Sequence, residues 1–146
     1  MKILLAEDDF VTRKFMVSFL SKYGECDVTV DGMEAVDAFM MALEDGEPYD
    51  LVCLDIMMPV MDGFGVLEYL VEHKYIEDIP VFIISADTSD KSLSRAYDLG
   101  AADVIAKPFN IRFVRRRINN IIELYDQRRQ LKSIVDEQNK IIGNRN

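Results

Sequence analysis

The stretch Leu51-Val52-Cys53-Leu54-Asp55 joins an apolar run of strand length to an acidic residue at its end. Short apolar runs of this kind are typical of parallel strands that are buried on both faces. Similar runs occupy residues 2–6, 26–30, 81–84 and 104–106. The sequence therefore predicts several buried strands, with enough chain between them for a helix each.

The segments between the expected strands carry helical signals. Asp31-Gly32-Met33-Glu34 matches a capping box in which Asp31 is the cap, and Gly24 and Gly100 stand where two helices should end. The expected helices are 11–23, 33–43, 65–72, 93–99 and 111–142. Regular alternation of strand and helix predicts an α/β fold, with a five-stranded parallel sheet and helices on both faces.

Composition and charge restrict the function. The net charge is −9, but residues 1–109 hold 8 Lys and Arg against 22 Asp and Glu, or −14, whereas residues 110–146 hold 9 against 4, or +5. An acidic body argues against nucleic-acid binding by the globular part. No apolar run approaches the roughly 20 residues that span a bilayer, so a cytoplasmic protein is expected. Cys26 and Cys53 should be buried thiols, and a single histidine, His73, excludes a multi-histidine metal site.

Polar side chains follow four of the expected strands. Because ligands bind at the carboxyl ends of parallel strands, these side chains should converge on one site. Each signal is weak alone, since Asp often caps a helix, Ser often lies in a turn, and Lys is often solvated. The combination on one edge of the sheet is harder to explain without function. The residues concerned are Asp8, Asp9, Asp55, Ser85 and Lys107.

This set of side chains suits phosphoryl chemistry. Carboxylates packed so closely repel one another unless a cation intervenes, and Mg²⁺ suits a small site with few protein ligands. Asp55 could then act as a nucleophile that forms an aspartyl phosphate. Lys107 would offset charge on the phosphoryl oxygens, and the Ser85 hydroxyl would donate to one of them.

Four segments resemble the signatures of bacterial two-component response-regulator receiver domains, the CheY-like family. They are 4–9 (LLAEDD), 55–64 (DIMMPVMDGF), 83–86 (IISA) and 107–109 (KPF), in the family's order and spacing. The resemblance covers residues 2 to about 122. It implies a flavodoxin-like or CheY-like fold with strand order 2-1-3-4-5, a receiver domain over 1–122, and an extension or linker over 123–146.

The resemblance also implies roles. Asp8 or Asp9 and Asp55 would hold Mg²⁺ with the backbone carbonyl of Met57, and Asp55 would take its phosphoryl group from a sensor histidine kinase or a phosphotransfer protein. Catalysis beyond the chain's own phosphorylation and dephosphorylation is not expected. The Lys107–Pro108 bond is expected to be cis. One departure is Val104, where receivers usually carry Tyr or Phe. Output should therefore pass through loop motion and the surface of helix 4, strand 5 and helix 5.

The tail from Ile111 reads as one long helix. Leu124, Leu131 and Gln138 recur every seven residues, and Gln127, Ile134 and Ile141 lie three after each. This weak heptad pattern favours a coiled coil able to form a parallel homodimer, against a frayed amphipathic extension. Arginine clusters at 115–117 and 128–129 match no nucleic-acid motif, so direct nucleic-acid binding is not expected.

Two other classes of α/β protein need residues that this sequence lacks. A haloacid-dehalogenase-type phosphatase needs a second Asp two residues after its nucleophile, where this chain has Met57. A flavodoxin-like cofactor binder needs a phosphate-cradling loop after the first strand, where Glu7-Asp8-Asp9 would repel a phosphate. An interaction module without phosphorylation, and a receiver fragment of a cyclic-dinucleotide-metabolising regulator, stay open as alternatives.

Overall fold

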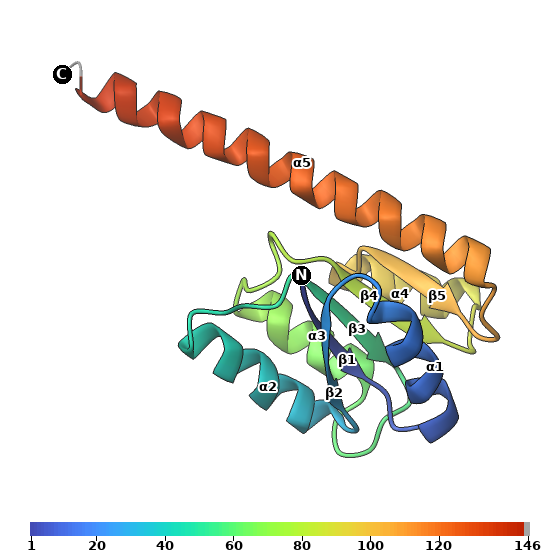
Figure 1. Cartoon of the computed structure of the whole chain (residues 1–146). Coiled ribbons are helices and arrows are strands. Elements are labelled where there is room, and N and C mark those ends of the chain that lie inside the picture. The colour runs from blue at the N-terminus through green and yellow to red at the C-terminus, as the bar shows by residue number, and fades with distance from the viewer. Residues whose placement is uncertain (145–146) are drawn as a thin grey trace. The chain divides into compact units, whose positions relative to one another are not determined.

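The computed structural model describes residues 1–144, and in that range five strands alternate with five helices (Figure 1). Every pair of neighbouring strands is parallel, and the order is β2-β1-β3-β4-β5. The predicted fold class and strand order are therefore confirmed. The strands are β1 Lys2–Ala6, β2 Glu25–Thr29, β3 Leu51–Asp55, β4 Val81–Ser85 and β5 Asp103–Ala106.

Four of the helices begin at an Asp or Ser cap. Asp31 accepts a hydrogen bond from the backbone N–H of Glu34, as the predicted capping box requires, and Asp62 does the same for Gly65. The helices are α1 Phe10–Leu20, α2 Gly32–Glu44, α3 Gly63–Glu72, α4 Asp90–Leu99 and α5 Ile111–Asn144.

Two helix ends differ by three residues from the sequence-based expectation, and the other ends lie within two residues of it. α1 stops at Leu20 rather than near Gly24, because Ser21 Oγ donates to the Val17 carbonyl and the next N–H groups bond three residues back, which tightens the last turn. α4 starts at Asp90 rather than at Leu93. Its first turn has no apolar residue to signal a helix, and Ser89 provides the cap.

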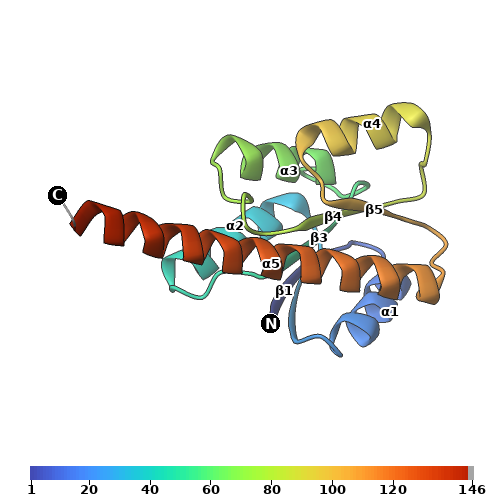
Figure 2. The same ribbon diagram turned by 90° about the horizontal axis from the view of Figure 1, so that it is seen from above.

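The sheet is buried on both faces (Figure 2). On one face, Leu54 and Ile83 pack in a core with Phe39 of α2 and Leu67 of α3. The other face is covered by α1, whose Met16 and Leu20 are fully buried. Burial of a large apolar side chain contributes about 1.5–3 kcal/mol. The core therefore fixes the sheet and holds the carboxyl ends of its strands in register.

The chain divides into two compact units at Asn110. The first holds the sheet and α1 to α4, and the second is α5. The boundary expected near residue 122 stays a prediction, and residues 145–146 of the expected extension lie outside the described residues. Across residues 1–144, helices long and apolar enough to cross a membrane are absent. Cys26 and Cys53 are free thiols; Cys53 is buried as expected, whereas Cys26 on β2 is only half-buried. Partial burial still raises the pKa of Cys26 to about 11.

Candidate functional site

The carboxyl ends of β1, β3, β4 and β5 carry the candidate site. Asp55 pairs with Ile84 in the sheet register, and Ser85 pairs with Ala106, so these strands end side by side. Backbone hydrogen bonds continue one residue further: Glu7 N–H donates to Thr29, and Lys107 N–H donates to Ser85. The hydrogen bonds of the sheet therefore fix the backbone positions from which four side chains enter the site: those of Glu7, Asp55, Ser85 and Lys107.

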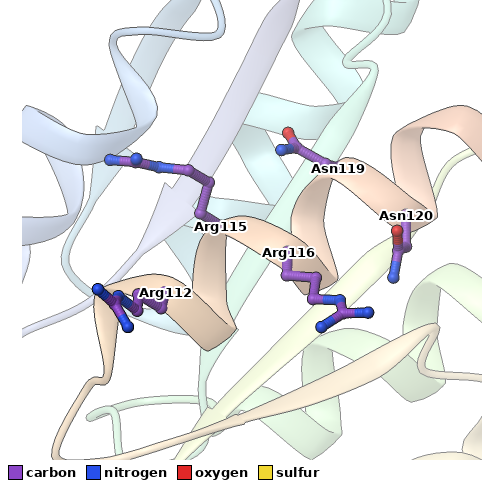
Figure 3. Close-up of a pocket in the computed structure, with 5 residues that line it drawn as sticks. All are labelled: Arg112, Arg115, Arg116, Asn119 and Asn120. Atoms are coloured by element: carbon purple, nitrogen blue, oxygen red, sulfur yellow. The ribbon is translucent and has the colours of Figure 1, made fainter.

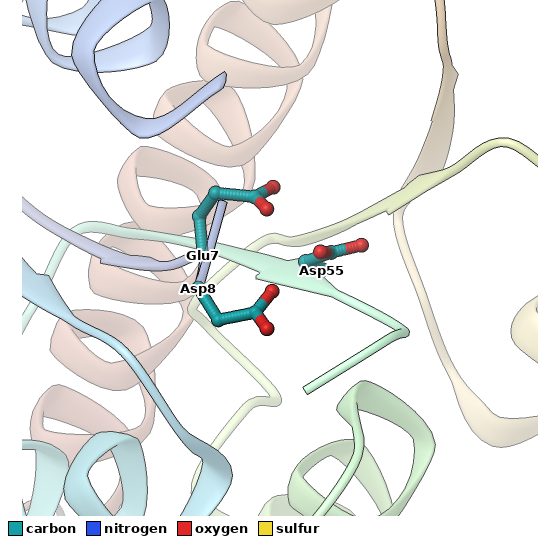
Figure 4. A group of neighbouring side chains, drawn as sticks. All are labelled: Glu7, Asp8 and Asp55. Atoms are coloured by element: carbon teal, nitrogen blue, oxygen red, sulfur yellow. The ribbon is translucent and has the colours of Figure 1, made fainter. Parts of the chain in front are cut away.

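Three carboxylates and one ammonium meet at this edge. Glu7, Asp8 and Asp55 each place an oxygen within 4.8 Å of the other two, and Figure 4 shows their carboxylates grouped together. Lys107 Nζ lies 3.3 Å from Asp55 Oδ2 and 3.2 Å from Glu7 Oε2. Glu7 and Asp55 are buried, and Asp8 is exposed. The structure thus brings together Asp8, Asp55 and Lys107 of the predicted site.

The cluster has more negative than positive charge. With all groups ionised, three carboxylates and one ammonium sum to −2. The pKa of Glu7 is raised to about 7, first by burial and second by the neighbouring Asp55, while Lys107 opposes the change. Burial disfavours the charge on Lys107, but Asp55 and Glu7 outweigh it, so the pKa of Lys107 is raised. A divalent cation among these oxygens would offset the remaining charge.

Asp9, the other predicted ligand, is used differently in this structure. Its carboxylate caps α1 and accepts hydrogen bonds from the backbone N–H and the hydroxyl of Thr12, at 2.9 and 2.6 Å. These bonds lower the pKa of Asp9. The third carboxylate of the acidic cluster, beside Asp8 and Asp55, is that of Glu7 and not that of Asp9. Asp9 immediately precedes the first residue of a helix, where a carboxylate satisfies free N–H groups, and this explains its position.

Glu7 and Arg13 are site residues that the sequence reasoning missed. Arg13 Nη1 donates to the backbone carbonyls of Glu7 and Asp8, at 3.1 and 3.2 Å, and so holds the acidic turn in place. Glu7 comes directly after β1, whose last four residues are buried. An acidic residue at that position lies at the carboxyl edge of the sheet. Its place directly after the apolar run is the sequence signal that could have identified Glu7.

The Ser85 hydroxyl faces its own loop in this structure. Ser85 Oγ donates to the Asp87 carbonyl and accepts from the Asp87 N–H, both at 2.9 Å. Met57, the other predicted site residue, has an exposed side chain, and its N–H lies 3.4 Å from Asp55 Oδ1. Val104 is buried in β5. The Lys107–Pro108 bond is cis, as the resemblance implied.

The loop after Asp55 is held close to the β3 backbone. Gly63 N–H donates to the Ile56 carbonyl at 3.0 Å, and a Cβ on Gly63 would lie only 2.4 Å from the Asp55 carbonyl oxygen. Only glycine fits this approach, because the atoms that a side chain would meet belong to the backbone. The chain therefore needs Gly63 to place α3 against the end of β3.

Val60 in the same loop has a strained backbone. Its φ is 70°, a left-handed value that is rare for a β-branched residue. The side chain is 79% exposed, so little packing depends on it. We predict that Val60→Asn raises the free energy of unfolding by about 1 kcal/mol, since Asn tolerates this conformation. Urea unfolding checks this, with Val11→Asn on the exposed face of α1 as the control that should not stabilise. A less stable Val60→Asn would contradict it.

A second polar surface lies on α5. A shallow pocket of about 310 Å³ is lined by residues spaced three to four apart along one helix face (Figure 3). They are Arg112, Arg115, Arg116, Asn119 and Asn120. The surface is positive, as the charge count of the tail predicted. The expectation that the chain does not bind nucleic acid directly stays a prediction.

Comparisons with known proteins agree with this geometry. The family model of the response regulator receiver domain matches residues 3–119. Response regulator RR06 of Streptococcus pneumoniae is 34% identical over 126 residues, which cover 86% of this chain and 54% of RR06. Regulatory protein VanRB of Enterococcus faecalis is 34% identical over 122 residues, covering 83% of this chain and 52% of VanRB. The chain thus spans about half the length of these curated relatives.

Solved structures give the same result. The receiver domain of the Francisella response regulator 1452 has a TM-score of 0.71 and 30% identity, with 84% of this chain and 96% of that chain covered. A chain of the Borrelia burgdorferi CheX–CheY–BeF₃–Mg²⁺ complex has a TM-score of 0.73 and 28% identity, with 83% of this chain and 88% of that chain covered. With the acidic cluster and Lys107 at the end of a 2-1-3-4-5 sheet, these matches show that the chain belongs to the response regulator receiver domain family of two-component systems.

Proposed function

We propose that this chain is a phosphorylation-dependent signalling switch in which Asp55 accepts the phosphoryl group. The observation that carries the proposal is the position of Asp55: it is buried at the end of β3, with Lys107 Nζ 3.3 Å from its Oδ2. A buried carboxylate held beside a cation is oriented as a nucleophile, and the cation can take up charge on the incoming phosphoryl oxygens.

The residues present fit a magnesium ion. Glu7 Oε2 is buried and lacks a hydrogen-bond partner among residues 1–144, although Lys107 Nζ lies 3.2 Å from it. A buried carboxylate oxygen without a partner is costly, and a cation would satisfy it. Glu7, Asp8 and Asp55 would hold the ion, and the Met57 carbonyl stays a proposed fourth ligand. When bound, Mg²⁺ would offset negative charge between the carboxylates and the phosphoryl oxygens.

The protein's own groups then account for the transfer. A carboxylate oxygen of Asp55 attacks phosphorus, and the bond from phosphorus to the donor's nitrogen or oxygen breaks, with its electron pair leaving on the donor. Lys107 offsets charge on the transferred group. The Ser85 hydroxyl can donate to a phosphoryl oxygen only after it gives up its bond to the Asp87 carbonyl. That exchange would pull on the β4–α4 loop and so convert phosphorylation into movement.

The signal would leave through the surface of α4, β5 and α5. Val104 stands where a switch aromatic is usual, so the rearranged β4–α4 loop is the proposed relay. A sensor histidine kinase or a phosphotransfer protein in the cytoplasm would supply the phosphoryl group, and catalysis would be limited to the chain's own Asp55. The exposed apolar residues of α5, which include Leu131 and Ile141, support a homodimer through this helix.

Incubation with acetyl phosphate and Mg²⁺ tests the proposed function. We expect intact-mass spectrometry to record one phosphoryl adduct, which tandem mass spectrometry of borohydride-reduced peptides assigns to Asp55. EDTA should abolish the adduct, because the acidic cluster would then repel the phosphoryl donor. A chain that stays unmodified with Mg²⁺ and with every small phosphodonor offered would favour an interaction module without phosphorylation.

A further inference from the structure

The face of α5 beyond residue 122 is apolar and exposed. Leu124, Leu131, Ile134 and Ile141 are between 45% and 64% exposed. They lie on the heptad seam that the sequence predicts, with Gln127 and Gln138 at the two remaining seam positions. A stripe of this kind gains stability only when another helix covers it. Val135 and Ile142 border the seam and are also exposed.

Two charged residues flank this seam on opposite sides. Glu123 and Arg128 are five residues apart, which places them roughly 140° apart around the helix axis. They are therefore too far around the helix to pair with each other. Within residues 1–144, neither Glu123 nor Arg128 takes part in a hydrogen bond or ion pair, and the Arg128 guanidinium lies over the ring of Tyr125, 5.0 Å from its centroid. Both charges are left for a partner.

A second copy of this chain supplies the complement. In a parallel in-register pair, the residue just before Leu124 on one helix lies beside the residue just after Gln127 on the partner, five positions further along the chain. Glu123 of each helix then faces Arg128 of the other, which gives two symmetric ion pairs. Gln127 and Gln138 each meet their own copy, and glutamine can both donate and accept hydrogen bonds.

An antiparallel pair fits the seam but not the charges. The register that matches apolar layers sets Leu124 against Ile141 and Gln127 against Gln138. In that arrangement Arg128 lies beside Val135 and Glu123 lies near the helix end, so neither charge has a partner. The seam alone therefore does not choose an orientation, whereas Glu123 and Arg128 favour the parallel one.

We propose that α5 forms a parallel, in-register homodimer whose orientation and register are set by Glu123 pairing with Arg128 of the second copy. This inference rests on the proposed dimerisation and adds the residues that decide its geometry. The pairs flank an exposed seam, so each contributes modestly and is weakened by salt. Their main effect is on the choice of partner and orientation.

Charge reversal in the full chain tests the pairing. We expect Glu123→Arg and Arg128→Glu each to weaken dimerisation roughly tenfold in sedimentation equilibrium, because two attractions become two repulsions. An equimolar mixture of the two variants should recover the affinity, since a parallel heterodimer restores both ion pairs. Asp136→Arg, on the outer face of the helix, is the control: mixing it with Glu123→Arg or with Arg128→Glu should not recover the affinity. A mixture that stays as weak as the single variants would overturn the proposal.

Cysteine cross-linking tests the orientation. Ile141→Cys should form a disulfide-linked dimer under mild oxidation, because like positions meet across a parallel seam. Asp136→Cys and the unaltered chain, which holds only Cys26 and Cys53, are the controls. A disulfide that forms only when Ile141→Cys is mixed with Leu124→Cys would mean an antiparallel pair and would overturn the proposal. So would a chain that is monomeric at every concentration.

The same variants separate this inference from the proposed function. Glu123 and Arg128 lie outside the acidic cluster, so all the variants should still take one phosphoryl adduct from acetyl phosphate. An unaltered chain that takes the adduct but stays monomeric at every concentration refutes the helix pairing alone. Loss of the adduct in the unaltered chain refutes the switch and leaves the pairing to be judged by sedimentation and cross-linking.

Discussion

Asp55→Asn will take up no phosphoryl group from acetyl phosphate, under conditions in which the unaltered chain gains one adduct. The substitution keeps the size and shape of the side chain but replaces a carboxylate nucleophile by an uncharged amide. Ser85 also lies at this sheet edge, but its hydroxyl is held by two hydrogen bonds to Asp87. We therefore expect complete loss of the adduct in intact-mass spectrometry.

Two controls separate this loss from misfolding. Asp62→Asn lies on the same loop, where Asp62 caps α3 at 2.8 Å from Gly65 N. Asn is an equally good cap, so this variant should keep both its fold and its adduct. Asp55→Asn itself should unfold in EDTA at a temperature no lower than the unaltered chain, because it removes one of three clustered negative charges. An adduct that persists in Asp55→Asn would show that another residue is the phosphoacceptor.

The fold was predictable because the sheet is buried on both faces. Strands such as Leu51–Asp55 carry continuous apolar runs, which a sequence displays directly, and parallel connections leave few arrangements open. The helix ends were less predictable. The last turn of α1 depends on a serine that bonds back to Val17, and the first turn of α4 depends on a serine cap, so neither has an apolar signature.

The candidate site was only partly predictable, for a physical reason. The expected strand ends predicted which residues would lie close together, and Asp8, Asp55 and Lys107 do lie close together. The choice among three consecutive acidic residues depends on where β1 stops and α1 begins, a matter of one residue. Buried Glu7 continues the line of the strand, whereas Asp9 turns to cap α1. Hydropathy does not resolve a boundary to one residue.

The ligand set leads to a second large effect, on the affinity for Mg²⁺. Asp8→Asn and Glu7→Gln should each weaken Mg²⁺ binding at least tenfold, since even groups behind the ligands of a metal site contribute roughly 10–100-fold to affinity. With all groups ionised the set sums to −2, and each variant then removes one of its negative charges. Glu7→Gln also removes the buried oxygen that lacks a hydrogen-bond partner among the described residues. A Mg²⁺ titration followed by NMR amide shifts measures the affinity of each variant.

Asp9→Asn is the matched control for this titration, because it neutralises the third acidic residue of the same turn while it keeps the cap of α1. Its affinity for Mg²⁺ should stay close to that of the unaltered chain. Thermal unfolding in EDTA adds a readout that needs no metal: Asp8→Asn and Glu7→Gln should be more stable than the unaltered chain, since each relieves repulsion within the cluster. A loss of affinity in Asp9→Asn as large as that in Asp8→Asn would return Asp9 to the ligand set. It would then follow that the first turn of α1 rearranges when the ion binds, because the Asp9 carboxylate cannot keep both of its bonds to Thr12 and also turn toward the cluster.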